Sequence, residues 1–458
     1  MPTTPELAKL IQALNDRAIL PSDPNFDAAR EVWNAMVNRK PSVIAKCHDG
    51  NDVALAIAAA RAEGLPVSIR GGGHNIAGTA VGEGAMMIDL SGMRTIVIDA
   101  ERREAQVEGG ATWADLDIAA QAQGLAVPGG VVSTTGVAGL TLGGGFGWLA
   151  RLHGLAADNL VSVDLVLADG TKVTASADDH TDLFWAIRGG SGNFGVATKF
   201  TFRMHDLAPE VLFGPTFFAL NDAERVLQAY GKFASDLPRE ACVWANLMTA
   251  PPVPILPEHA HGTKVLNLVQ FYAGDENTGR AHLGALYGDA TPLGSGLAMR
   301  PFTEAQQFLD AAYPFGARNY WRAHNHTHLS DALISTLIDL APDLPTPESE
   351  LLICQLGGAI SDVPVDATAF PHRNVPFVST PGVRWHDASD DTRVIGWLKA
   401  ASKRIAAHAV PGAYVNFVAE TEGRAADAYG SNLSRLADIK RRYDPENLFR
   451  INQNVAPA

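Results

Sequence analysis

Cysteine is scarce in this sequence. Among 458 residues only Cys47, Cys242 and Cys354 occur, far apart and in no paired spacing. A disulfide framework needs a larger, closely spaced set, and a zinc site needs clustered Cys or His. The pattern therefore argues against both and favours a reducing compartment.

An excess of positive charge and a long apolar run are also missing. The formal net charge is −14, and the 36 Lys and Arg residues are scattered. Nucleic acids and anionic membranes need clustered basic residues, so we expect neither as the main partner. No stretch is long and apolar enough to span a bilayer, and the first residues do not resemble a signal peptide. We expect a cytoplasmic protein, a monomer or a homodimer.

The chain contains a dinucleotide-binding string of glycines, but without the flanking strand and helix that this signature requires. Gly190, Gly192 and Gly195 satisfy G-x-G-x-x-G as a string. That fingerprint needs a strand before the glycines and a helix after them. Here residues 182–187 look helical and residues 196–202 look like a strand, so a Rossmann domain is disfavoured.

Two helical patterns open the chain, at 7–14 and 26–36, and neither contains obvious chemistry. A β-α-β unit follows, with a strand at 42–47, an alanine-rich helix at 52–63 and a second strand at 65–70. Because the hydrophobic fraction is 47% and the chain is long, we expect a globular protein of two or three domains. Past residue 205 proline and aromatic residues replace the glycine clusters, which predicts a second α+β domain with a sheet covered by helices.

The stretch Ile69–Asn75 sets His74 at the tip of a glycine run directly after a strand. Three successive glycines let the main chain and its N–H groups approach a bulky anionic ligand. Such a loop can also be a tight turn with a solvated histidine, so this loop alone leaves both interpretations open.

A second unusual stretch covers residues 127–148, of which eight are glycine. Ordering so many glycines costs conformational entropy, and a folded protein keeps them mainly where the backbone must lie against a planar or phosphorylated group. The interspersed Val131, Val132, Leu140 and Trp148 argue against a flexible linker.

Four motifs, in order, carry a resemblance to a known family: the R-G-G-G-H-N loop at 70–75, the glycine-rich segment at 135–145, the run at 183–196, and the ending Y-D-P-E-N-L-F-R-I-N-Q-N at 443–454. The chain resembles the berberine-bridge-enzyme-like FAD-linked oxidases of the vanillyl-alcohol-oxidase class. The resemblance implies an α+β fold in which FAD lies between two α+β subdomains. The implied domains are an FAD-binding domain (1–204), a substrate-binding domain (205–410) and a C-terminal return to the first (411–458).

By position, the family implies that His74 is bonded covalently to the 8α-methyl carbon of FAD. A neutral imidazole is a competent nucleophile for that carbon. Members with two covalent bonds use a cysteine where this chain has Val132, so we expect attachment through His74 only. Plant members often carry a histidine where Leu140 stands. The implied FAD-binding residues are Arg70, Gly71, Gly72, Gly73, His74, Asn75, Val132, Thr135, Gly136, Gly139, Leu140, Gly143, Gly144, Gly195, Val196, Asn452 and Asn454.

The implied reaction removes a hydride from a C–H bond beside an O–H or N–H of a small amine or alkaloid, sugar or alcohol. Electrons then pass to molecular oxygen with release of peroxide. Tyr414 is our first candidate for the base, because a phenol whose pKa is lowered by nearby positive charge can accept a proton. It is predicted to share one face of a strand at 413–418 with Asn416. Further candidates facing the flavin are Gln355, Tyr320 and His372; all four residues can instead be structural.

Other features of the sequence suggest alternative functions. His324, His326 and His328 would point the same way in an extended segment and could hold a metal ion for hydrolysis. However, Ser330 and Asp331 look like a helix start, and no carboxylate cluster completes the set. A flavoprotein dehydrogenase with another acceptor, or an inactive flavin-binding protein, are the remaining alternatives.

Overall fold

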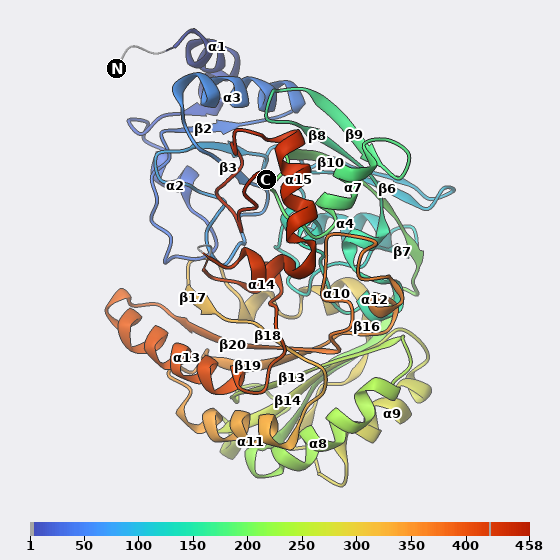
Figure 1. The fold of residues 1–458 in the computed structure, drawn as a ribbon. Coiled ribbons are helices and arrows are strands. Elements are labelled where there is room, and N and C mark those ends of the chain that lie inside the picture. Colours follow the sequence, from blue (N-terminus) through green and yellow to red (C-terminus); the bar gives the residue numbers. More distant parts are fainter. Residues whose placement is uncertain (1–3, 421–422) are drawn as a thin grey trace.

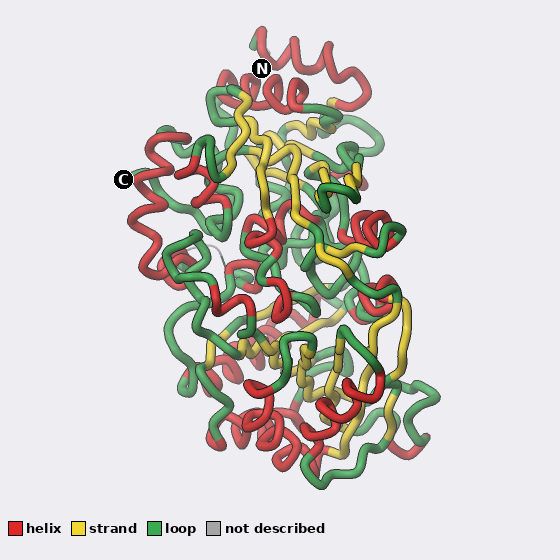
Figure 2. The backbone as a smooth tube through the Cα atoms, turned by 90° about the vertical axis from the view of Figure 1, so that its right-hand side faces the viewer, coloured by secondary structure: helices red, strands yellow, loops and turns green. Residues whose placement is uncertain are grey.

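The structure is a computed structural model that describes residues 4–420 and 423–458. It has an upper and a lower half, stacked one above the other (Figure 1). The upper half contains two small sheets. The lower half contains a large sheet, whose outer face is covered by helices in both Figure 1 and Figure 2.

The first small sheet has the strand order β1-β2-β4-β3. Because β2 and β3 both run parallel to β4, their carboxyl ends meet at one edge. The apolar faces of the two covering helices pack on this sheet. The bounds are α1 Pro5–Leu14, β1 Ala18–Ile19, β2 Val43–Lys46, α3 Gly50–Glu63, β3 Val67–Arg70 and β4 Met86–Asp89.

The second small sheet is antiparallel, with the order β5-β6-β10-β8-β9. Its core includes Trp113, Phe194 and Phe200, all fully buried. A separate pair joins β7 to β11. The bounds are β5 Ile96–Asp99, β6 Glu104–Glu108, α4 Trp113–Gln121, β7 Leu125–Ala126, α5 Val137–Leu142, α6 Ala150–His153, β8 Leu160–Val166, β9 Lys172–Ser176, α7 Thr181–Ile187, β10 Val196–Arg203 and β11 His205–Asp206.

The large sheet has nine strands among the described residues, with the main order β15-β12-β14-β13-β19-β20-β17. One face packs on helices α8, α9, α11 and α13, and the other packs on the upper half through residues such as Phe146, Trp148 and Trp244. The bounds are β12 Glu210–Ala219, α8 Ala223–Phe233, β13 Ala241–Thr249, β14 Lys264–Tyr272, α9 Glu276–Gly284, β15 Gly294–Ser295, β16 Ala298–Pro301, α10 Phe302–Gln307, β17 Arg318–Trp321, β18 His324–His326, α11 Asp331–Leu340, β19 Glu350–Gln355, α12 Ala359–Asp362, β20 Phe377–Trp385 and α13 Asp391–Ala406.

A buried arginine ties the two halves together. Arg151 on α6 donates hydrogen bonds to the carbonyl oxygens of Leu237, Ala241 and Leu356 in the lower half, at 3.0, 2.8 and 2.7 Å. Burial lowers the pKa of this guanidinium. Three carbonyl acceptors satisfy the donors of a side chain that would be costly to bury unpaired.

The C-terminal segment returns to the upper half as helices α14 (Ala425–Tyr429) and α15 (Leu433–Tyr443), red in Figure 1. Tyr429, Leu436 and Val455 belong to the same buried cluster as Phe200 of β10. The last residues therefore lie beside the two small sheets, far in sequence from their neighbours in space.

Two local predictions are wrong. The helix expected over 26–36 ends early, as α2 spans Phe26–Arg30 and Glu31 is already extended. The strand expected over 413–418 is replaced by a 3₁₀ turn at Val415–Phe417. The turn at Val415–Phe417 lines the cavity described below, and the segment after α2 places Trp33 against the ring of His74.

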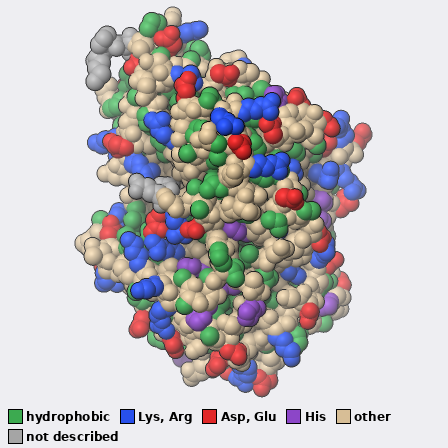
Figure 3. Space-filling view, viewed as in Figure 1, with side chains coloured by type: hydrophobic (Ala, Val, Ile, Leu, Met, Phe, Trp, Pro, Cys, Tyr) green, Lys and Arg blue, Asp and Glu red, His purple; other side chains and the backbone are tan. Residues whose placement is uncertain are grey.

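The surface agrees with the scattered charge of the sequence. On the face shown in Figure 3, acidic and basic side chains are interspersed over both halves. All three cysteines are free and buried, and burial raises the pKa of the Cys242 thiol to about 12. Within the described residues, every helix is too short or too polar to cross a membrane.

Candidate active site

A cavity of about 270 Å³ runs from the glycine loops of the upper half to the inner face of the large sheet. Its lining includes both loops singled out in the sequence, the end of the chain, and residues of β13, β19 and β20. Among the described residues that line it, Glu350 is the only Asp, Glu, Lys or Arg. An anionic ligand here would have to be held by backbone N–H groups and neutral side chains.

His74 lies where the parallel sheet ends. Arg70 and Asp89 face each other at the ends of β3 and β4, and the guanidinium makes two hydrogen bonds to the carboxylate, at 3.1 and 2.5 Å. This pair fixes the point at which the glycine run begins. The imidazole of His74 reaches the cavity, and burial lowers its pKa to about 4. His74 is therefore a neutral imidazole at physiological pH.

The two glycine loops touch backbone to backbone. A Cβ on Gly72 would lie 2.4 Å from the nitrogen of Gly136, so no larger residue fits at either position. Gly139 and Gly192 differ, because a Cβ there would meet no atom within 4 Å although both residues line the cavity. Neither needs a positive φ. Their missing side chains leave room for a ligand.

The wall opposite the glycine loops carries the one charged side chain of the described lining. Glu350 accepts a 2.6 Å hydrogen bond from the hydroxyl of Tyr313 and a 2.5 Å bond from Nδ2 of Asn246. Trp321 packs edge-on against Tyr313, with ring centroids 6.1 Å apart. Thr380 and Trp244 also line the cavity, and the hydroxyl of Thr380 and indole nitrogen of Trp244 have no partner within the described residues. The arrangement offers a carboxylate and free polar atoms between aromatic rings.

Tyr414 and Asn416 line the cavity side by side. The hydroxyl oxygen of Tyr414 accepts hydrogen bonds from Asn416 Nδ2 at 2.8 Å and from the N–H of Gly145 at 3.2 Å. Burial raises the pKa of Tyr414, which contradicts the expectation of a phenol pKa lowered by positive charge. Because both acceptor positions of the oxygen are used, Tyr414 can donate a proton but is a poor proton acceptor.

The other three candidates for catalysis do not line the cavity. Gln355 bonds Val243 N–H and Ala234 carbonyl on the face of the large sheet that carries the helices. Tyr320 bonds Glu420 and packs in a cluster with Val394 and Leu398 of α13, and His372 shares a 3.2 Å hydrogen bond with the carbonyl of Ala428. The predictions that these side chains face the cavity are wrong: Gln355 and Tyr320 lie on the strand faces turned away from it, and His372 lies in the loop before β20.

The alternation also shows what the sequence reasoning missed. On β19 the residues that line the cavity are Glu350 and Leu352, whereas Gln355 faces the other way. On β17 it is Trp321, the neighbour of Tyr320, that lines it. A period-of-two pattern groups Glu350 with Leu352 on one face of β19 and Leu351 with Gln355 on the other, but each face carries a polar residue, so the pattern alone does not identify the cavity face.

Most implied FAD-binding residues line the cavity, and five do not: Arg70, Gly143, Gly144, Val196 and Asn454. Arg70 is bound to Asp89, the Cβ position of Gly143 is taken by Asn416, and Val196 points into a buried cluster. The cavity is also lined by residues that were not among the implied FAD-binding residues, most of them inside the same motifs: Gly130, Val131, Ser191, Gly192, Ala197, Phe449, Ile451 and Gln453.

The histidine tract is not a metal site. His324 shares a 2.8 Å hydrogen bond with Ser402, and His326 bonds Ser379 and the carbonyl of His408, at 2.8 and 3.1 Å. Across residues 4–420 and 423–458, no three His, Cys, Asp or Glu side chains gather as metal ligands would. His324 and His326 are therefore occupied by hydrogen bonds within the protein.

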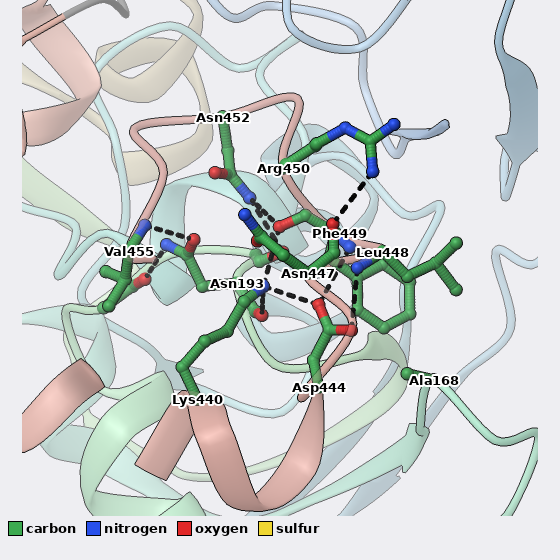
Figure 4. A network of polar contacts seen from close by, with 12 residues as sticks. Ala168, Asn193, Lys440, Asp444, Asn447, Leu448, Phe449, Arg450, Asn452 and Val455 are labelled. Atoms are coloured by element: carbon green, nitrogen blue, oxygen red, sulfur yellow. Dashed lines mark hydrogen bonds and ion pairs between the residues drawn. The ribbon is translucent and has the colours of Figure 1, made fainter. Parts of the chain in front are cut away.

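A buried ion pair holds two of the loops that line the cavity (Figure 4). Lys440 and Asp444 are fully buried on and after α15, with Nζ and Oδ2 2.6 Å apart. Lys440 also donates to the carbonyl oxygens of Asn193 and Phe449, at 2.6 and 2.9 Å. Asn193 in turn accepts from the N–H of Val455. The network joins the loop at 190–195 to the chain end at 449–455.

The site fits FAD by three observations. The glycine loops line the cavity with bare backbone, Gly139 and Gly192 leave open space, and the side-chain oxygens of Asn452 and Gln453 are buried without partners in the described chain. His74 supplies a neutral nitrogen at the cavity wall. The residues that would hold the cofactor therefore come from both small sheets and from the chain end.

Comparison with known proteins also points to FAD. The FAD binding domain family matches residues 41–176, and the berberine and berberine-like family matches residues 413–456. The chain belongs to the berberine-bridge-enzyme-like family of FAD-linked oxidoreductases, as predicted. The predicted α+β fold of the vanillyl-alcohol-oxidase type is also confirmed.

Individual relatives align over nearly the whole chain. The FAD-linked oxidoreductase YvdP of Bacillus subtilis is 30% identical over 97% of this chain and 99% of its own. (R)-6-hydroxynicotine oxidase of Paenarthrobacter nicotinovorans is 29% identical, with 97% of each chain covered. The crystal structure of 6-hydroxy-D-nicotine oxidase from Arthrobacter nicotinovorans superposes with a TM-score of 0.87 at 26% identity, over 96% of this chain and 98% of that one.

Proposed function

We propose that this FAD-dependent enzyme is an oxidase of a small cationic amine, that oxygen is its electron acceptor, and that FAD is attached through His74 alone. The observation that carries the substrate class is Glu350, the one charged side chain in the described cavity lining. A carboxylate held between aromatic rings favours an ammonium group, which gains both an ion pair and contact with ring faces. The relative named (R)-6-hydroxynicotine oxidase lends support.

Bound FAD would supply the hydride acceptor and pass two electrons to oxygen. The side chains of the cavity do the rest. Glu350, fixed by Tyr313 and Asn246, binds the ammonium group and accepts its proton, which leaves a neutral amine able to lose hydride. Tyr414, whose oxygen already accepts two hydrogen bonds, keeps its proton and donates a hydrogen bond that orients the substrate.

The single tether is supported by the residues around the cavity. His74 and Val132 both line it, and all three cysteines are buried elsewhere: Cys47 in the core of the first sheet, Cys242 and Cys354 in the cluster between the two halves. A thiol is the usual second attachment in this family, and Val132 stands at its position.

A peroxide assay tests the proposed function. Primary and secondary amines are compared with neutral alcohols and sugars of similar size, and hydrogen peroxide is measured together with oxygen uptake. We expect one peroxide for each amine oxidised. Turnover that needs an added dye acceptor and yields no peroxide would instead identify a dehydrogenase, and oxidation of the neutral compounds alone would reject the substrate class.

A further inference from the structure

Two side chains from outside its own loop hold the ring of His74. The indole of Trp33 stacks on the imidazole, with ring centroids 4.8 Å apart and planes 19° from parallel. On another edge, Nε2 shares a 3.0 Å hydrogen bond with the hydroxyl of Thr134. The backbone N–H of Trp33 also donates to the carbonyl of Gly73 at 3.1 Å. The plane and rotation of the ring are thus set by contacts with two other segments.

Both holding segments are anchored in the lower half of the molecule. The indole N–H of Trp33 donates to the carbonyl oxygen of Tyr313 at 3.0 Å. Ser133, directly before Thr134, donates from its N–H and its hydroxyl to the two carboxylate oxygens of Asp310, at 2.8 and 2.6 Å. Asp310 and Tyr313 belong to one short segment that follows α10. That segment also reaches the cavity through the hydroxyl of Tyr313 on Glu350.

We propose that Trp33 and Asp310 are positioning residues for the attachment of FAD to His74, so that attachment requires the substrate-binding half to be docked. This inference rests on the proposed single tether. Attachment joins a ring nitrogen of His74 to the 8α-methyl carbon; one hydrogen of the methyl group and one of the imidazole are removed. The two electrons reach molecular oxygen, which leaves as hydrogen peroxide.

The physical reason is orientation. A bond forms quickly only when the nucleophile is held close to its target and correctly aligned, and a displacement of about 1 Å can slow a reaction about 100-fold. Trp33 is buried and restricts tilt of the ring, whereas Thr134, held through Ser133 and Asp310, restricts its rotation. Loss of either contact leaves His74 in place but less often aligned.

The test measures attachment separately from binding. Protein from a riboflavin-deficient host is incubated with FAD in air, sampled over time and precipitated with acid. Flavin in the pellet is covalent, and flavin in the supernatant was bound or free. We expect Asp310→Ala, Trp33→Phe and Thr134→Val to slow the appearance of pellet flavin at least tenfold, and Thr134→Ser, which keeps the hydroxyl, to attach at the wild-type rate.

Controls separate the possible failures. Glu304→Ala removes an exposed carboxylate from neighbouring α10 and should leave attachment unchanged. FAD binding by each variant before attachment, measured by flavin fluorescence, should stay within twofold of wild type; a purely structural role would lower binding and attachment together. Wild-type attachment rates in Asp310→Ala and Trp33→Phe would overturn the positioning roles. A colourless wild-type pellet would instead reject the tether itself, and the inference with it.

Discussion

The hydroxyl of Tyr313 donates a 2.6 Å hydrogen bond to the carboxylate of Glu350, and both side chains line the cavity. The backbone of the same tyrosine accepts a hydrogen bond from Trp33, which stacks on His74. One residue therefore contacts both the proposed substrate anchor and the support of the proposed flavin tether. The two sides of the active site are built on a shared segment.

Gly139 should be required by the ligand and not by the fold. Gly139→Leu adds a side chain to helix α5 where no protein atom lies within 4 Å of the new Cβ. Leucine favours helix over glycine by about 0.7 kcal/mol, so the variant should fold at least as stably as wild type. We expect its FAD content, measured by absorbance of the purified protein, to fall at least tenfold.

The matched control is Gly396→Leu on exposed helix α13, where a Cβ also meets nothing. It should gain the same helix propensity and keep its FAD. Equal FAD content in the two variants would mean that the open space beside Gly139 is not used by the cofactor.

The buried pair of Lys440 and Asp444 should stabilise both the fold and the cofactor loops. Lys440→Met leaves the carboxylate of Asp444 buried without its counter-ion, and breaking such a pair costs about 3–5 kcal/mol. We expect a loss of this size in urea unfolding, together with a lower FAD content of the purified protein.

Arg441→Gln serves as the comparison, because it removes an exposed ion pair with Asp438 from the same helix. Surface pairs contribute at most about 1 kcal/mol. If the two variants lose similar stability, the network in Figure 4 does not hold the loops as described.

His326 should make stability depend on pH. Burial lowers the pKa of His326 to about 4, below its ordinary value near 6.5. Between these values the unfolded chain binds a proton that the folded chain does not, so stability falls as pH falls, by up to about 1.4 kcal/mol per pH unit for one group. Above pH 6.5 this contribution to the pH dependence vanishes.

The difference in unfolding free energy between wild type and His326→Gln isolates that contribution, because other titrating groups cancel. Among them is Asp117, whose pKa burial raises to about 7 and which acts in the opposite direction. The advantage of wild type should shrink steadily from pH 6.5 to pH 4.5. A constant difference over this range would show that His326 titrates equally in both states.

Local chemistry explains which features of the site could be predicted. The glycine loop, His74 and the strand before it are set by neighbouring residues, since only glycine permits the close backbone approach of Gly72 and Gly136. The β-α-β unit follows from periodicity and from Gly64, which ends α3 with φ 66°. These features depend on short stretches of sequence.

Other features depend on contacts across the whole chain. Trp33 lies in a segment with a helical pattern, yet it leaves the helix to bond Tyr313, 280 residues away. Whether Gln355 or Glu350 faces the cavity depends on which side of β19 the helices cover, and the sequence of the strand does not determine that packing. Tyr414 lines the cavity, but it precedes a 3₁₀ turn instead of lying on a strand. Burial raises the pKa of its phenol, whereas the prediction required a lowered pKa.

The most direct test of the account is the effect of Glu350→Gln on kcat/KM for a cationic amine that wild type oxidises, measured beside an uncharged substrate analogue. Loss of the charge-assisted contact should lower kcat/KM for the amine 10- to 100-fold, about 1.4–2.8 kcal/mol, and change the analogue little. Glu348→Gln, which alters an exposed carboxylate paired with His386, should leave both values unchanged. An amine kcat/KM within twofold of wild type in Glu350→Gln would contradict the proposed recognition of an ammonium group.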